Sequence, residues 1–83
     1  MTESRPLTIK YFAQLREVRG LSSEDRQSTA ATPADLYAEL QNQYGFSLPQ
    51  ERLRVAINDR FAEWSDGLQA HDTVAFIPPV GGG

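Results

Sequence analysis

The stretch Asp72-Thr-Val-Ala-Phe-Ile-Pro-Pro-Val-Gly-Gly-Gly83 decides how the rest of the chain is interpreted. Residues 73–77 alternate in character, so that Val74 and Phe76 share one face, which predicts a strand with a buried side. Pro78-Pro79 ends that strand, because proline cannot donate a hydrogen bond to a sheet. The predicted core strand is therefore followed directly by two prolines, which stiffen the chain where it leaves the sheet.

The segment after this strand forms a narrow tail. It consists of Pro78, Pro79, Val80, Gly81, Gly82 and Gly83. Glycine has no Cβ, so it can enter a channel that excludes every other residue. Six extended residues span about 20 Å, and they end in one α-carboxylate. A carboxylate becomes a good electrophile once it is activated, for example as an acyl-adenylate. A glycine-rich end is also typical of a loose terminus, but its place directly after two prolines favours a functional tail.

The remaining elements follow from hydrophobic spacing upstream of the tail. We expect strands at 7–12, 23–31, 53–57 and 60–64, a short helix at 13–19 and a main helix at 33–44. Thr32 is a suitable cap for the main helix, Pro33 fits its first position, and Gly45 is a natural stop. These elements predict an α+β roll in which one main helix covers a sheet of four to five strands. We assign residues 1–6 to a flexible leader, 7–77 to the domain and 78–83 to the tail.

Composition excludes most catalytic machinery. The 83 residues include no cysteine, which excludes disulfides, thiolate zinc sites and a cysteine nucleophile, and one histidine, His71, which cannot build a His-rich metal site. The net charge of −3, with Lys10 as the one lysine, argues against nucleic-acid binding. No apolar run approaches the ~20 residues of a membrane helix. We expect a cytoplasmic protein without a metal or a bound cofactor, in which His71 is a solvated turn residue.

The same alternation predicts a docking surface near the tail. If Leu7, Ile9 and Tyr11 face the core, Phe12 faces away from it, and Ile77 likewise lies opposite Val74 and Phe76 in the final strand. With Phe61, just after the expected Asn58-Asp59 turn, these residues would form an exposed apolar patch. The predicted patch is Phe12, Phe61 and Ile77, with Arg16 as a candidate rim contact. Trp64 fits an interface anchor or partly buried packing equally well.

Two segments resemble the ubiquitin-like β-grasp sulfur carriers, and most of all the small subunits of molybdopterin synthase. Tyr11-Phe-Ala-Gln-Leu-Arg-Glu17 is similar to that family's F-A-x-[LV]-R-E segment after the first strand. The ending from Asp72 is similar to its D-x-V-A-F-[FI]-P-P-V-x-G-G motif, with Gly82-Gly83 as the functional pair. Ala70-His71 stands where the family often has Asp-Gly. The resemblance implies a mixed sheet in the β-grasp arrangement.

The resemblance also implies a function. An E1-like enzyme would adenylate Gly83 with ATP, and sulfur from a donor such as a cysteine desulfurase system would replace AMP to give a thiocarboxylate. The tail would then enter the large catalytic subunit of molybdopterin synthase, within a heterotetramer, and donate sulfur for the dithiolene of the molybdenum cofactor. The chain would thus be a subunit that carries sulfur without being an enzyme by itself.

Two other functions remain open at this point. The chain could carry sulfur for thiamine, cysteine or a thiolated tRNA base. It could also be a ubiquitin-like protein modifier or a plain binding module. Isopeptide conjugates of Gly83 would indicate the modifier, and copurification with a pterin-binding subunit would indicate the synthase.

Overall fold

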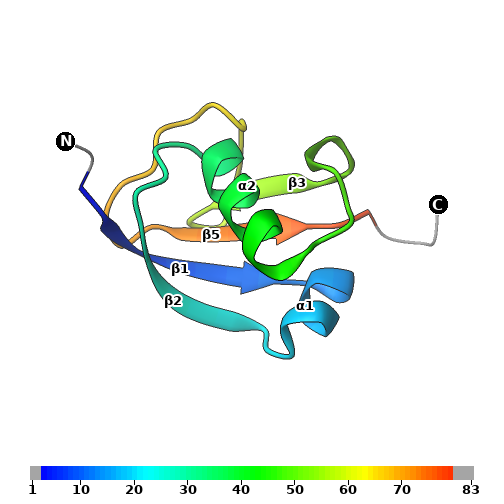
Figure 1. Cartoon of the computed structure of the whole chain (residues 1–83). Coiled ribbons are helices and arrows are strands. Elements are labelled where there is room, and N and C mark those ends of the chain that lie inside the picture. Colours follow the sequence, from blue (N-terminus) through cyan, green and yellow to red (C-terminus); the bar gives the residue numbers. More distant parts are fainter. Residues whose placement is uncertain (1–2, 80–83) are drawn as a thin grey trace.

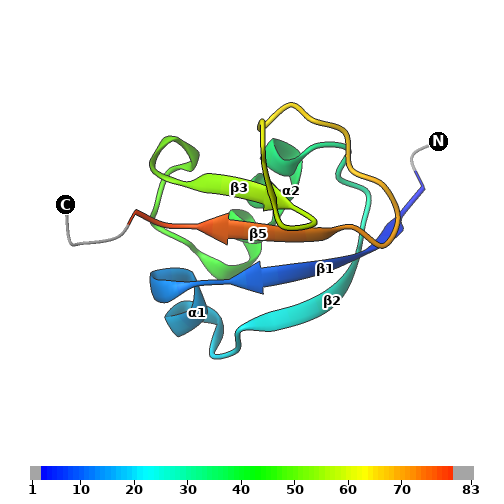
Figure 2. The same ribbon diagram turned by 180° about the vertical axis from the view of Figure 1, so that it is seen from behind.

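A mixed five-stranded sheet carries the fold in the computed structural model, which describes residues 3–79 (Figure 1). The elements are β1 (Arg5–Tyr11), α1 (Ala13–Arg19), β2 (Ser23–Ser28), α2 (Pro33–Tyr44), the 3-10 turn η1 (Gln50–Arg52), β3 (Arg54–Ile57), β4 (Arg60–Ala62) and β5 (Thr73–Ile77). The strand order is β2-β1-β5-β3-β4, in which β1 and β5 are parallel and the other neighbours are antiparallel. Helix α2 covers one face of this sheet, and Figure 2 shows the other face. The predicted fold class is confirmed.

Helix α2 begins and ends where its sequence signals predict. The Thr32 side chain accepts a hydrogen bond from the backbone N–H of Asp35 at 3.2 Å, and Pro33 occupies the first turn. Gly45 takes a left-handed conformation with φ of 71° and donates its N–H to the Gln41 carbonyl at 2.8 Å. A residue with a Cβ would be strained there, so Gly45 ends the helix for a steric reason.

A two-residue hairpin joins β3 to β4. Asn58 and Asp59 have φ values of 53° and 69°, as a type I′ turn requires. The Asn58 side chain also donates to Asp72 Oδ1 and accepts from the backbone N–H of Thr73, both at 2.9 Å. The predicted turn is confirmed, and it is tied to the start of β5.

The core lies between α2 and the inner face of the sheet. Phe76 of β5 is fully buried, and its ring lies 5.3 Å from that of Tyr37 and 5.9 Å from that of Trp64, measured between centroids. Trp64 is partly buried against this cluster, so it packs the core. The other buried core residues, which include the predicted ones, are Leu7, Ile9, Tyr11, Leu15, Ala30, Leu36, Leu40, Phe46, Leu53, Val55, Leu68 and Val74.

Four of the strands differ from the sequence prediction at one or both ends. Two of these differences are of one residue: β1 ends at Tyr11 rather than at residue 12, and β3 begins at Arg54 rather than at residue 53. Strand β1 begins at Arg5, so two residues assigned to the leader belong to the sheet; Pro6 lies opposite Gln27, and its carbonyl accepts the N–H of His71 at 2.7 Å. Proline is tolerated there because pairing with β5 starts only at Thr8. Strand β4 ends at Ala62 rather than at residue 64.

Strand β2 ends at Ser28, earlier than the expected residue 31. The buried Ser28 hydroxyl donates to Glu39 Oε1 at 2.8 Å and accepts the N–H of Ala30 at 3.0 Å. This local hydrogen bond competes with strand pairing and turns the chain toward α2.

A polar cluster joins β1 to β2 and α1. The Tyr11 hydroxyl donates to Glu24 Oε2 at 2.6 Å, and Glu24 also pairs with Arg19. The Arg19 guanidinium lies 3.8 Å from the Tyr44 ring centroid. Burial, and then the hydrogen bond to Glu24, raise the pKa of Tyr11 above its ordinary value of 10.0.

This raised pKa predicts a loss of stability in alkali. Above pH 10 the unfolded chain loses the Tyr11 proton while the folded chain keeps it, so the stability linked to this proton falls as pH rises. Tyr11→Phe should cost about 1–3 kcal/mol at pH 7, because it deletes the hydrogen bond. Its denaturant stability should then fall less steeply than wild type between pH 9 and pH 11. Equal slopes in both proteins would contradict this role; burial also raises the pKa of Tyr37, so some slope remains in the variant.

Candidate functional site

The candidate site begins where the chain leaves β5. This strand lies in the middle of the sheet, between β1 and β3, and it points toward the end of the molecule that carries α1 and η1 (Figures 1 and 2). Pro78 is buried and Pro79 is exposed, so the chain leaves the protein surface between these two residues. Val80, Gly81, Gly82 and Gly83 lie outside the described residues. The root of the tail is therefore fixed by the central strand.

The outer face of the sheet, opposite α2, lies beside this exit. Strand register places Lys10, Ala75, Ala56 and Phe61 in one row across four strands. The neighbouring row pairs Ile77 with Arg54. The two alanines in the middle of the first row have small side chains that do not cover the Phe61 ring. Phe61 is 68% exposed.

Two of the predicted docking residues meet on this face. Phe61 and Ile77 line one surface depression of about 210 Å³, together with Ala56 and Asp59. Phe12 follows directly after β1 and is 42% exposed. Because Tyr11 and Phe76 are register partners, Phe12 and Ile77 are the next residues along two parallel neighbours. Their role in binding stays a prediction.

Arg16 lies on α1 near Phe12, and it does not line the depression formed by Phe61 and Ile77. It is exposed on α1, one turn after Phe12, whose carbonyl accepts the Arg16 backbone N–H at 3.5 Å. Its side chain thus belongs to the helix beside the exit and not to the sheet face. His71 is an exposed turn residue with φ of 73°, as expected from the sequence.

Sequence reasoning missed Arg54, which lies at the centre of this surface. Its guanidinium carbon lies 4.6 Å from the Phe61 ring centroid, a cation–π arrangement. Alternation within 53–57 places Arg54 outward, but the sequence does not reveal that Ile77 is its strand partner or that Phe61 lies under it. Knowledge of the β3–β4 register was needed to find this group.

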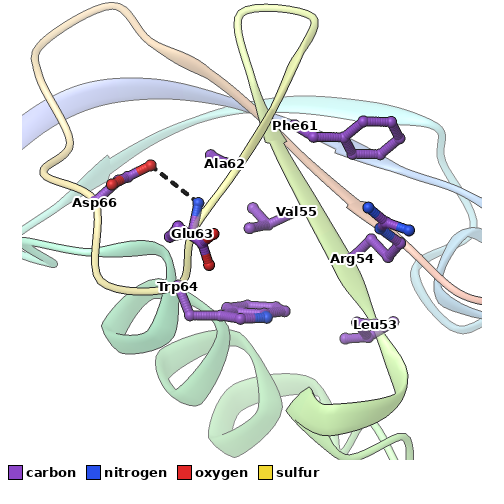
Figure 3. A pocket seen from close by; sticks show the side chains of 8 residues that line it. All are labelled: Leu53, Arg54, Val55, Phe61, Ala62, Glu63, Trp64 and Asp66. Carbon is purple, nitrogen blue, oxygen red and sulfur yellow. Dashed lines mark hydrogen bonds between the residues drawn. The ribbon is translucent and has the colours of Figure 1, made fainter.

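A cavity of about 300 Å³ lies behind Arg54 and Phe61, between β3 and the chain that leaves β4 (Figure 3). Its lining is Leu53, Arg54, Val55, Phe61, Ala62, Glu63, Trp64 and Asp66. Asp66 Oδ2 accepts the backbone N–H of Glu63 at 2.9 Å, which shapes the turn at its edge. Figure 3 shows Trp64 below this cavity, where it packs toward α2.

Two features of residues 3–79 bear on other classes of function. No three histidine, aspartate or glutamate side chains gather there closely enough to hold a metal ion. None of the helices in the same range has the length and apolar character needed to cross a membrane.

Comparison with known proteins identifies the family. The sequence profile of the ThiS family matches residues 9–83. The chain belongs to this family. It is 32% identical over 80 residues to the molybdopterin synthase sulfur carrier subunit of Haemophilus influenzae, a match that covers 93% of this chain and 99% of that protein. The resemblance inferred from the two sequence segments is thereby confirmed.

Solved structures support the same assignment of the fold. A putative molybdopterin converting factor subunit 1 from Pyrococcus furiosus matches with a TM-score of 0.74 and 25% identity, over 93% of this chain and 100% of that one. SAMP1 from Haloferax volcanii matches with a TM-score of 0.73 and 26% identity, over 94% and 99% of the two chains. This ThiS-family chain therefore has the β-grasp arrangement of the ubiquitin-like sulfur carriers.

The two faces of the sheet predict unequal losses of stability when an aromatic ring is removed. Phe76→Ala should cost about 3–5 kcal/mol of unfolding free energy, because it leaves a cavity among buried rings. Phe61→Ala should cost less than about 1 kcal/mol, because its ring contacts mainly solvent and Arg54. Urea unfolding of both variants checks this, and similar losses would show that Phe61 belongs to the core.

Proposed function

We propose that this ThiS-family chain is the sulfur carrier subunit of a molybdopterin synthase, with the carbonyl carbon of Gly83 as its reactive centre. The observation that carries the proposal is the central β5, which ends at Ile77 and is followed by a buried Pro78 and an exposed Pro79 at the end of the sheet. The sequence relatives named as sulfur carrier subunits support the same function. The folded body delivers the tail, and the catalytic groups belong to partner enzymes.

The proposed chemistry starts with a poor electrophile. A carboxylate oxygen of Gly83 attacks the α-phosphorus of ATP on an E1-like adenylating enzyme, and pyrophosphate leaves. A persulfide sulfur, supplied by a cysteine desulfurase system, then attacks the acyl carbon and displaces AMP. A thiol reduces the resulting acyl disulfide, which leaves a thiocarboxylate on Gly83. At neutral pH this thiocarboxylate is a far better nucleophile than the original carboxylate.

The dimensions of the tail fit delivery into another protein. Four residues follow Pro79, and fully extended they span at most about 14 Å. Gly81, Gly82 and Gly83 carry no side chains, so a channel around them can be as narrow as the backbone itself. We propose that Pro78, Pro79 and Val80 form the stiff root of this segment. The large catalytic subunit of the synthase, in a heterotetramer, would hold the pterin precursor at the end of the channel.

The proposed docking surface comprises Phe12, Phe61 and Ile77, with Arg16 at its rim. Two of these side chains line one depression, and the strand that carries Ile77 continues into the tail. Docking there limits how far from the partner's surface the reacting carbon can reach, because the number of residues between Ile77 and Gly83 sets the maximum length of the tail. The absence of cysteine from the chain fits a cytoplasmic carrier whose cargo sits on the main chain.

Intact-mass measurement tests the proposed reactive centre. After incubation with the E1-like enzyme, ATP, a cysteine desulfurase and cysteine, the C-terminal peptide should show one oxygen replaced by sulfur at Gly83. Deletion of Gly83 should abolish both this product and dithiolene formation, while the thermal unfolding midpoint stays unchanged.

A matched control is Ser4→Gly, an exposed substitution just before the start of β1, which lies at the opposite end of the sheet from the end of its parallel neighbour β5. It should accept sulfur as the wild type does. Full dithiolene formation by the Gly83 deletion would remove the proposal.

A protein modifier is the second candidate. It is favoured by the likeness to SAMP1, the small archaeal modifier protein 1 of Haloferax volcanii. The same activated Gly83 would then form an isopeptide bond with a lysine. Lysine-linked conjugates that require Gly83 in host extracts would indicate this function, whereas a thiocarboxylate without conjugates indicates the carrier.

A further inference from the structure

Arg54 stacks on an aromatic ring on the outer face of the sheet. Its guanidinium lies over the Phe61 ring, at 4.6 Å from the centroid, and its strand partner is Ile77. Figure 3 shows the Arg54 and Phe61 side chains on the same side of the β3–β4 hairpin, with the guanidinium directed toward the ring. A stacked guanidinium has already lost part of its rotamer freedom, so it gives up less entropy when it binds a partner group.

Arg54 also lacks a carboxylate partner within the described part of the chain. The ion pairs among residues 3–79 are Arg19–Glu24 and Arg26–Glu39, both beside the helices. The chain as a whole carries a net charge of −3. On the outer face, the two rows nearest the exit carry Lys10 and Arg54. Two carboxylates lie nearby, Glu63 in the cavity that Arg54 also lines and Asp59 in the depression beside Phe61 and Ile77, but neither forms an ion pair with Arg54.

Docking on this face creates a specific electrostatic requirement. Phe61 and Ile77 flank Arg54, so a partner that covers these two apolar side chains also removes water from the guanidinium between them. A guanidinium that loses water without gaining an anion is strongly destabilising, whereas a carboxylate matches its fork of donors in a bidentate pair. The partner must therefore bring an acceptor, and a charged one satisfies it best.

We propose that Arg54 is a specificity-determining residue of the docking surface and pairs with a carboxylate on the large subunit of the synthase. This inference rests on the proposed function and adds to it the chemistry of the partner's surface. The partner presents an apolar patch that covers Phe61 and Ile77 and an Asp or Glu side chain opposite Arg54. A homologous large subunit without that acid would be rejected, because it would leave Arg54 buried and unpaired.

Binding of Arg54 variants to the purified large subunit from the same host tests this pairing. Calorimetry is carried out at low and at high salt. At low salt, Arg54→Gln should bind the large subunit at least about tenfold more weakly than the wild type does. High salt should weaken wild-type binding more than it weakens the variant, because an ionic contact is missing from the variant. Arg54→Lys should fall between the two, since it keeps the charge and loses the planar fork. Arg52→Gln, an exposed arginine two residues away on η1, is the matched control and should bind within about twofold of wild type.

Each other outcome has a definite meaning. Wild-type affinity and salt dependence in Arg54→Gln would overturn the inference, and if Phe61→Ala binds weakly in the same experiment, the docking surface itself stands. Equal weakening by Arg52→Gln would show a general charge effect and would also overturn it. If the wild-type chain does not bind the large subunit, the proposed function and this inference fall together. Thermal unfolding of each variant confirms that the fold is retained.

Discussion

The position of β5 between β1 and β3 is the constraint on which the rest of the structure depends. Hydrogen-bonded neighbours on both sides hold this strand, and Phe76 anchors it from below through Tyr37 and Trp64. A central strand cannot slip by one residue without exchanging its buried and exposed side chains. The register of β5 thus sets where Pro78 meets the surface, and that point sets where the tail begins.

One alternating strand serves two purposes. Val74 and Phe76 point into the core, while Ala75 and Ile77 point to the outer face. The inner residues supply stability through packed rings. On the outer face, Ile77 and Ala56 line a shallow depression together with Phe61, and the Arg54 guanidinium lies over the Phe61 ring. Under the proposed function, the inner face supplies stability and the outer face supplies recognition, although neighbouring residues of one strand contribute to both.

The sequence predicted those features that depend on local signals. Thr32, Pro33 and Gly45 mark the ends of α2 through caps that act within one turn, and alternation alone identified the inward residues of β1 and β5. The sequence did not predict features that depend on pairing between distant segments. The start of β1 was missed because Arg5 and Pro6 break the alternation and are held by Ser28 and Gln27 of β2. Arg54 was missed because its surroundings come from Ile77 and Phe61, on two different strands.

The parallel pairing of β1 with β5 has a consequence for synthesis on the ribosome. Thr8 pairs with Thr73, so the middle of the sheet stays vacant until residues 73–77 have been translated. Contacts between such distant segments form slowly. Until β5 has paired, α2 packs against an incomplete sheet. Strand β5 is therefore the element that completes the sheet. Residues 81–83 emerge from the ribosome after β5. An enzyme therefore cannot reach these glycines before the strand that completes the sheet has been synthesised.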